Sequence, residues 1–196
     1  MATMTIRPEG RRDVAAREAL LDAAFGEARL AKTAERLREG RVPAKGLSFI
    51  AGNGAGVIGT VRLWNIAAGP GHPALLLGPL AVASHARNQG VGAALVQHAL
   101  RAASAAGHAA VLLVGDAPYY GRFGFSAAKT GALWLPGPYE RERLLACELV
   151  PGALDRARGL VGATGRRLPA PYTRQDLAAL VASLVRNDNE LAPRAA

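Results

Sequence analysis

The chain of 196 residues suits one domain, long enough to bury a hydrophobic core without disulfides or metals. Its formal net charge is +9, but the basic residues are scattered and no basic block is interleaved with aromatic residues, so we expect no nucleic-acid partner. The single cysteine, Cys147, excludes an internal disulfide, and no Cys/His cluster has metal-ligand spacing, so we expect no metal.

The N-terminal part of the chain predicts one strand followed by two helices. Residues 1–8 lack the apolar segment of a signal peptide, and no apolar run approaches the roughly 18 residues of a membrane span, so we expect a cytoplasmic protein with no membrane partner. Residues 3–7 are compatible with a strand that Pro8 closes. Apolar residues at near-helical spacing then predict helices over 11–25 and about 29–38.

Three strands are predicted next. Two apolar runs, 47–51 and 57–66, are separated by a glycine-rich segment that is typical of a hairpin turn. The second run alternates, and Trp64 lies on one of its faces, where it either packs in the core or walls a pocket. Residues 74–82 form another apolar run. Pro79 interrupts it, because proline lacks the N–H that a ladder bond needs, so we expect a bulge or a parting of strands.

A turn with two glycines joins that strand to the next helix. Residues 92–106 have helical spacing and 111–114 is a short apolar strand, so the unit is predicted to be a parallel strand-helix-strand crossover. Gly90 and Gly92 remove side chains where the first-turn amides lack internal partners, and the helix dipole adds positive charge. We therefore expect a phosphate or pyrophosphate there, with Arg87 at the rim.

The chain then predicts a very short helix and two closing strands. Asp116 and Pro118 start the helix, which bears two tyrosines. Residues 132–135 and 144–150 are predicted to pair with each other at the end of the sheet, linked through 136–139.

Two common phosphate-binding motifs do not fit the glycine turn. A P-loop needs Lys followed by Ser or Thr after its last glycine, whereas Ala93 and Ala94 follow Gly92. A dinucleotide fingerprint needs Gly or Ala three residues after the second glycine, where Leu95 stands. It also needs an acidic residue about 20 positions on, and 108–114 has none. The pattern that remains is Arg-x-x-Gly-x-Gly.

This pattern and two others together resemble the GNAT superfamily of N-acetyltransferases. Arg-x-x-Gly-x-Gly over 87–92 is similar to the acyl-coenzyme A pyrophosphate loop of that superfamily. Leu-Gly-Pro-Leu-Ala-Val over 77–82 and Tyr-Tyr-x-Arg-Phe-Gly-Phe over 119–125 resemble motifs of a bacterial subgroup of predicted acetyltransferases. The resemblance covers residues 4–150.

The resemblance implies a fold and a set of site residues. The fold is the α/β GNAT acyltransferase fold, a mixed central sheet with splayed middle strands, flanked by helices. The thioester arm of acetyl-CoA would lie between these strands, on the backbone of Leu80, Ala81 and Val82. Tyr120 lies four residues before Gly124, where the superfamily places its general acid, whereas Tyr119 is expected to pack. The pyrophosphate loop would comprise Arg87, Asn88, Gln89, Gly90, Val91, Gly92 and Ala93.

The acceptor side is less defined by the sequence. In the superfamily the first two helices overhang the acceptor, so Glu27, in the break between them, is a candidate contact for an amine, and Trp64 is a candidate wall. No general base is visible on 74–80, where some relatives carry a glutamate. Four alternatives stay open: His72, Glu27 or Asp116 acting through water, or an amine that arrives already neutral.

The composition shifts to Gly, Arg and Pro from Pro151 onward. We therefore divide the chain into a GNAT domain over 1–150 and a C-terminal extension over 151–196. The extension is expected to hold one helix, at about 173–186, because a capping-box pattern precedes an apolar stripe there. This helix would pack back on the core or meet a second subunit in a homodimer.

The sequence thus predicts an acetyl-CoA-dependent N-acetyltransferase that moves an acetyl group directly to a primary amine of a small molecule, protein or peptide. Acetyl-CoA would be the co-substrate and Tyr120 the catalytic residue. The alternative is a non-catalytic acyl-CoA-binding sensor or interaction module, which the missing base and the C-terminal extension would suit.

Overall fold

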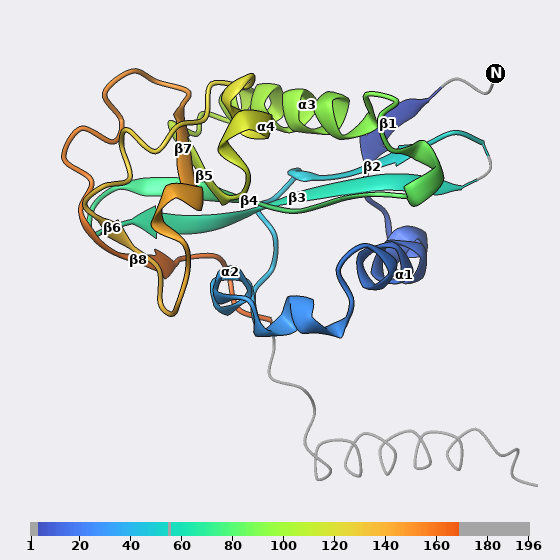
Figure 1. Cartoon of the computed structure of the whole chain (residues 1–196), viewed down its shortest axis with the longest axis horizontal. Coiled ribbons are helices and arrows are strands. Elements are labelled where there is room, and N and C mark those ends of the chain that lie inside the picture. The colour runs from blue at the N-terminus through green and yellow to red at the C-terminus, as the bar shows by residue number, and fades with distance from the viewer. Residues whose placement is uncertain (1–3, 55, 169–196) are drawn as a thin grey trace, which may run out of the picture.

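The computed structural model describes residues 4–54 and 56–168, and these form a mixed β-sheet with helices on both faces (Figure 1). Among the described helices, none combines the length and apolar character needed to span a bilayer. In chain order the elements are β1 (Thr5–Pro8), the 3-10 turn η1 (Arg11–Asp13), α1 (Val14–Phe25), η2 (Glu27–Ala31), α2 (Thr33–Arg36), β2 (Ser48–Gly52), β3 (Val57–Ala68), β4 (Pro73–Val82), η3 (Ser84–Ala86), α3 (Val91–Ala105), β5 (Ala110–Val114), α4 (Ala117–Gly121), β6 (Leu133–Trp134), η4 (Arg141–Arg143), β7 (Leu144–Glu148) and β8 (Gly159–Ala163).

The sheet follows the order β1-β2-β3-β4-β5-β7, and β8 adds to it by pairing with β3 and β6. Neighbours along this order are antiparallel except β4 and β5, which are parallel and joined through α3. The parallel crossover and the mixed sheet flanked by helices, both predicted from the sequence, are confirmed.

The two faces of β4 build two different parts of the core. Leu75 and Leu77 belong to the cluster that holds Leu95 of α3, whereas Leu76, between them, packs with Trp64 on the opposite face. This alternation follows from the two-residue period of a strand. Helices α3 and α4 therefore cover one face of the sheet, and α1 and α2 lie on the other (Figure 1).

A bulge interrupts β4 where the sequence places Pro79. The register with β3 shifts from Leu77 opposite Leu63 to Leu80 opposite Val61, so Gly78 and Pro79 occupy two positions where β3 has one. The indole Nε1 of Trp64 donates a hydrogen bond to the carbonyl oxygen of Gly78 at 2.6 Å. The bulge predicted at Pro79 is confirmed, and the buried indole satisfies a carbonyl that the bulge takes out of the ladder.

Strands β4 and β5 part soon after they meet. Their register holds only Leu75 opposite Val111 and Leu76 opposite Leu112, yet β4 continues to Val82. Beyond Leu76, the edge of β4 that faces β5 therefore has no strand partner among the described residues. The splayed middle strands that the resemblance implies are thus present.

The strand pairing at the far end of the sheet differs from the prediction. Strand β6 pairs with β8, and β7 pairs with β5, so 132–135 and 144–150 do not pair with each other. The linker between them does not form a tight turn, because it carries Pro136 and Pro138 and crosses to α2. There the guanidinium of Arg36 donates to the carbonyl of Pro136 at 2.7 Å, and the hydroxyl of Thr33 donates to the carbonyl of Pro138.

The chain does not leave the core at Pro151. Leu154, Ala157 and Val161 are buried, and β8 pairs with β3. The sheet therefore extends at least to Ala163, the end of β8, beyond the boundary expected at residue 150. The glycines and arginines around β8 concealed a strand of five residues. The helix predicted at about 173–186 lies outside the described residues.

The second predicted helix is shorter than expected. Residues 29–38 are predicted as one helix, but η2 ends at Ala31 and α2 spans only Thr33–Arg36. Lys32 between them has extended backbone angles, φ −67° and ψ 141°, and this breaks the helix. The resulting bend turns the side chains of Lys32 and Arg38 toward the space beneath the sheet, which is described below.

Gly69 is expected to tolerate no side chain, because the β3–β4 turn packs against Arg158. Gly69 has φ +76°, and a Cβ there would lie 1.9 Å from the carbonyl oxygen of Arg158. Gly71 has φ +78°, but a Cβ there would meet nothing within 4 Å. Both alanine variants carry left-handed strain of about 1 kcal/mol. Only Gly69→Ala adds an overlap that costs about 1–3 kcal/mol more.

Denaturant titration of the two variants measures this difference in the free energy of unfolding. A larger loss in Gly69→Ala than in Gly71→Ala is the expected result. Equal losses would contradict the packing of the turn against the segment before β8.

Candidate active site

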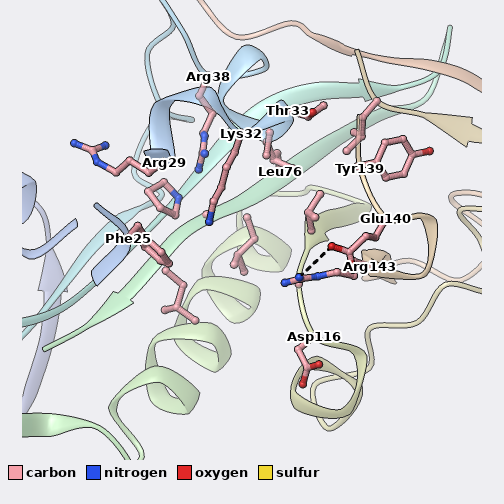
Figure 2. Close-up of a pocket in the computed structure, with 18 of the residues that line it drawn as sticks. Phe25, Arg29, Lys32, Thr33, Arg38, Leu76, Asp116, Tyr139, Glu140 and Arg143 are labelled. Carbon is pink, nitrogen blue, oxygen red and sulfur yellow. Dashed lines mark ion pairs between the residues drawn. The ribbon is translucent and has the colours of Figure 1, made fainter. Parts of the chain in front are cut away.

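A cavity of about 560 Å³ opens where β4 and β5 part. Its floor comes from residues 76–80 of β4 and its side from 114–116 at the end of β5, with Tyr120 of α4 beside them. The remaining walls come from the α1–α2 region and from 135–143 (Figure 2). The volume lies within the range of small-molecule sites, about 300–1,000 Å³.

Helix α4 places Tyr120 in this cavity. The carboxylate of Asp116 caps the helix by accepting the backbone N–H of Tyr119 at 3.3 Å, and Pro118 suits the first turn. The Tyr120 ring packs edge-on against Phe125, with 5.9 Å between ring centroids. Gly115 makes room for the ring, since a Cβ on Gly115 would lie 2.3 Å from a ring carbon of Tyr120.

Burial keeps the phenol of Tyr120 protonated over a wider pH range. Removal from water, with a smaller contribution from Tyr119, raises the pKa of the Tyr120 phenol to about 12. The hydroxyl therefore keeps its proton at neutral pH. A protonated phenol beside parted strands suits a group that donates a proton.

Leu80, Ala81 and Val82 present backbone to the gap between the strands. On one side they pair with Val61, Thr60 and Gly59 of β3, and on the other side β5 has already turned away. Leu80 lines the cavity, whereas the Ala81 side chain is buried against α1. A ligand between the strands would therefore contact the backbone of Ala81 and not its side chain.

The glycine loop leaves the first amides of α3 without intrahelical acceptors. Asn88 has φ 60° and Gly90 has φ 79°, so the chain turns sharply before the helix. The first bond that closes the helix runs from the N–H of Ala94 to the carbonyl of Gly90 at 2.9 Å. The N–H groups of Val91, Gly92 and Ala93 precede it and are therefore free for an anion.

The side chains around the loop have different roles. Val91 is buried, so only its amide can contact a ligand. The amide of Gln89 donates to the carbonyl of His85 at 2.8 Å and so braces the turn. Arg87 is exposed, and its Nε lies 3.4 Å from the carbonyl oxygen of Val82. Arg87 therefore connects the loop to the end of β4.

Tyr119 lies next to the glycine loop, in a position that the sequence did not predict. Its hydroxyl oxygen lies 2.8 Å from the place where a Cβ on Gly92 would stand. The guanidinium of Arg122 stacks over the Tyr119 ring, 4.3 Å from its centroid. Expected only to pack, Tyr119 thus lies against the start of α3. Sequence spacing carries no signal for this contact, because it joins two elements that are distant in the chain.

The residues predicted to contact the acceptor or to act as the general base do not lie together. Trp64 is buried under the bulge and is not among the residues that line the cavity. Glu27 begins η2, between the lining residues Phe25 and Arg29. His72 lies in the β3–β4 turn, where its Nδ1 is 3.0 Å from the carbonyl oxygen of Pro70. Asp116 lines the cavity.

The parted strands, the glycine loop and the tyrosine helix define the architecture of an acetyltransferase. Residues 44–127 match the family profile of the acetyltransferase (GNAT) domain. The GNAT-family N-acetyltransferase YhbS from Escherichia coli, crystallised in complex with CoA, is similar at 31% identity and a TM-score of 0.71, and the alignment covers 83% of this chain and 91% of that one. The chain therefore belongs to the GNAT acetyltransferase family.

Two further solved structures share the fold. A GNAT-family acetyltransferase from Brucella melitensis in complex with acetyl-CoA has 26% identity and a TM-score of 0.54, over 74% of this chain and 96% of that one. A GNAT-family acetyltransferase from Staphylococcus aureus has 15% identity and a TM-score of 0.52, over 75% of this chain and 99% of that one. Among curated proteins, no relative matches the chain.

Gly92→Ala is expected to weaken CoA binding about 10-fold. The added methyl would stand 2.8 Å from the Tyr119 hydroxyl and 3.5 Å from a methyl of Val82, so it would displace Tyr119 or the first turn of α3. It would deny the pyrophosphate one charge-assisted hydrogen bond, worth about 1.5–3 kcal/mol. Isothermal titration with CoA measures the loss.

The control for this variant is Gly162→Ala in β8, where a Cβ would meet nothing within 4 Å. It should bind CoA as the wild type does. Unchanged binding by Gly92→Ala would contradict the assignment of the loop to the pyrophosphate.

Proposed function

We propose that the protein catalyses the direct transfer of an acetyl group from acetyl-CoA to a primary amine. The observation that carries this proposal is the position of Tyr120, whose protonated phenol lines the same cavity as the unpaired edge of β4. The glycine loop supports it, because the free amides at the start of α3 suit the pyrophosphate of CoA.

Each part of the site has a distinct task in this proposal. Acetyl-CoA supplies the activated acyl group as a thioester. The loop and Arg87 bind the pyrophosphate, and the backbone at Leu80 to Val82 orients the thioester and offers N–H groups to the carbonyl oxygen as it becomes negative. As the amine nitrogen bonds to the carbonyl carbon and the C–S bond breaks, Tyr120 donates its proton to the sulfur.

The amine must be neutral when it reacts. Among the described residues that line the cavity, the carboxylates are those of Asp116 and Glu140. Asp116 is the one adjacent in sequence to the tyrosine helix, and we assign it as the group that accepts a proton from the incoming ammonium, through water. The nitrogen loses its second proton to water as the amide forms, and Tyr120 regains a proton from water.

Two measurements test the proposal in sequence. Calorimetric titration with acetyl-CoA tests donor binding, and release of the CoA thiol in the presence of a panel of primary amines tests transfer. Saturable binding and amine-dependent thiol release are expected. Absence of binding at millimolar acetyl-CoA would refute the proposal. Binding without transfer to any amine would instead favour the non-catalytic acyl-CoA-binding module.

A further inference from the structure

The acceptor side of the cavity is lined by more basic than acidic side chains. The basic residues are Arg29, Lys32, Arg38 and Arg143, and the acidic ones among the described residues are Asp116 and Glu140. We propose that the acceptor amine also carries an anionic group, a carboxylate or a phosphate, and that Arg38 and Lys32 bind it. This inference rests on the proposed acetyl transfer and specifies the class of its acceptor.

Arg38 provides the strongest evidence for an anion site. Its side chain is only 9% exposed, and its Nη2 pairs with Glu35 at 2.8 Å. Its Nε is buried without a hydrogen-bond partner among the described residues. A guanidinium has five N–H donors, and leaving them unpaired away from water is costly. One carboxylate does not satisfy this group, so Arg38 has donors available for a second anion.

Arg38 also has the right position. Its Nη1 lies 3.6 Å from where a Cβ on Gly78 would stand, so the guanidinium lies beside the bulge that floors the cavity. Figure 2 shows Arg38 and Lys32 extending from the α2 side toward the middle of the cavity. Burial lowers the pKa of Arg38 from its ordinary value, and an anion bound next to it would favour the charged form.

Lys32 adds a second positive charge whose partner is an aromatic ring. Its Nζ lies 5.1 Å from the centroid of the Phe25 ring, and no ion pair holds it among the described residues. Arg29, in contrast, is already paired with Glu18 at 2.6 Å and Asp22 at 2.9 Å, and Figure 2 shows it directed away from the centre. On the α2 side, Lys32 and the donors of Arg38 that Glu35 does not take are therefore available for a ligand.

The opposite wall does not cancel this charge. Arg143 extends into the cavity from beyond Tyr139, and its ion pair with Glu140 is long, at 3.7 Å (Figure 2). The carboxylate of Asp116 already accepts the N–H of Tyr119. Lys32 thus keeps an unpaired positive charge on the α2 side among the described residues, and a low-dielectric wall would strengthen its attraction for an anion.

The phosphates of the coenzyme do not account for these cations. The pyrophosphate loop begins α3, which covers one face of the sheet, whereas α2 lies on the other face (Figure 1). Residues 87–92 are not among those that line the cavity. A ligand bound by Arg38 and Lys32 therefore reaches the thioester from the side opposite the coenzyme. An acceptor with an amine at one end and an oxyanion at the other fits this arrangement.

The test compares matched amines at saturating acetyl-CoA. Amino acids are paired with their carboxamides, and 2-aminoethyl phosphate is paired with ethanolamine, so that each pair differs in the anionic group. The expected result is a kcat/KM at least 10-fold higher for the anionic member of one set, which also decides between carboxylate and phosphate. Lys32→Gln and Arg38→Gln should lower kcat/KM for the anionic member more than for its neutral partner, so that the ratio between the two falls.

Two controls accompany the variants. Arg38→Lys should restore part of the preference, because it keeps the charge. Arg101→Gln, on an exposed position of α3, removes one positive charge elsewhere and should leave the preference intact. Lys32 is exposed, so Lys32→Gln should fold normally even if the buried Arg38→Gln does not. Equal kcat/KM for anionic and neutral members in the wild type would overturn the inference and leave acetyl transfer standing.

A binding measurement separates this inference from the proposed function. With CoA present to fill the pyrophosphate loop, inorganic phosphate should raise the melting temperature of the wild type and of Arg101→Gln, but less so that of Lys32→Gln. An identical increase in all three proteins would refute the anion site. Failure of every amine to react would count against the proposed function, whereas the phosphate result would still decide on the anion site.

Discussion

Tyr120→Phe is expected to lower kcat for acetyl transfer by about 10-fold or more, the contribution of one positioned acid, with little change in the KM for acetyl-CoA. The variant removes the proton donor but keeps the ring that packs on Phe125. The departing thiolate would then take its proton from water. Steady-state kinetics of thiol release measure the change, and a shift in KM alone would indicate lost binding instead.

The pH dependence of kcat tests the role of Tyr120 a second time. The folded protein raises the pKa of Tyr120 to about 12, so the acid form persists as the pH rises and is lost only near that value. Tyr120 should therefore impose no alkaline decline on kcat below about pH 10. A decline in that range that is also present in Tyr120→Phe belongs to another group.

Tyr139→Phe is the matched control. It removes a phenol hydroxyl that already donates to the carbonyl of Leu133 at 3.1 Å, so kcat should change far less than in Tyr120→Phe. Full activity of Tyr120→Phe on a genuine acceptor would show that Tyr120 only packs.

Gly115→Ala is expected to lower kcat about as strongly as the loss of the hydroxyl itself. A Cβ on Gly115 would lie 2.3 Å and 2.7 Å from two ring carbons of Tyr120 and 2.9 Å from a methyl of Leu113. The ring would have to move by more than a few tenths of an ångström, and a displacement of about 1 Å at a reacting group can cost 10²-fold. Kinetics with saturating acetyl-CoA and a melting curve would record the activity and the fold together.

Gly121→Ala provides the comparison, because it lies in the same helix and a Cβ there would meet nothing within 4 Å. It should retain activity within about 2-fold, since surface substitutions are usually near neutral. If Gly115→Ala were equally active, the ring position described here would not matter for catalysis.

The features that the sequence predicted well are those with local causes. Pro79 has no N–H, and this alone required an irregular strand. Gly90 and Gly92 expose helix amides through their own missing side chains. Tyr120, which the resemblance singles out by its place four residues before Gly124, lines the cavity, and its role as the acid stays a prediction.

The features that the sequence did not predict depend on contacts between distant segments. Strand β8 is apolar only over a few residues, and its place in the sheet is decided by pairing with β3 and β6. Arg38 looked like one of many scattered basic residues, and only its burial beside Gly78 distinguishes it. For Trp64 the sequence allowed either core packing or the wall of a pocket, and the carbonyl freed by the bulge gives its buried indole a partner.

The contacts of α2 with the prolines of the β6–β7 linker have a mechanical consequence. Thr33 and Arg36 donate hydrogen bonds to the carbonyls of Pro138 and Pro136. Gly137 lies between these carbonyls, and a Cβ there would be only 3.0 Å from Arg36 Nη1 and from Thr33 Oγ1. These hydrogen bonds connect two walls of the cavity, the one from α2 and the one from the β6–β7 linker. Moving these two walls apart would therefore require breaking two hydrogen bonds that are remote from Tyr120, whereas a motion of both walls together would keep them.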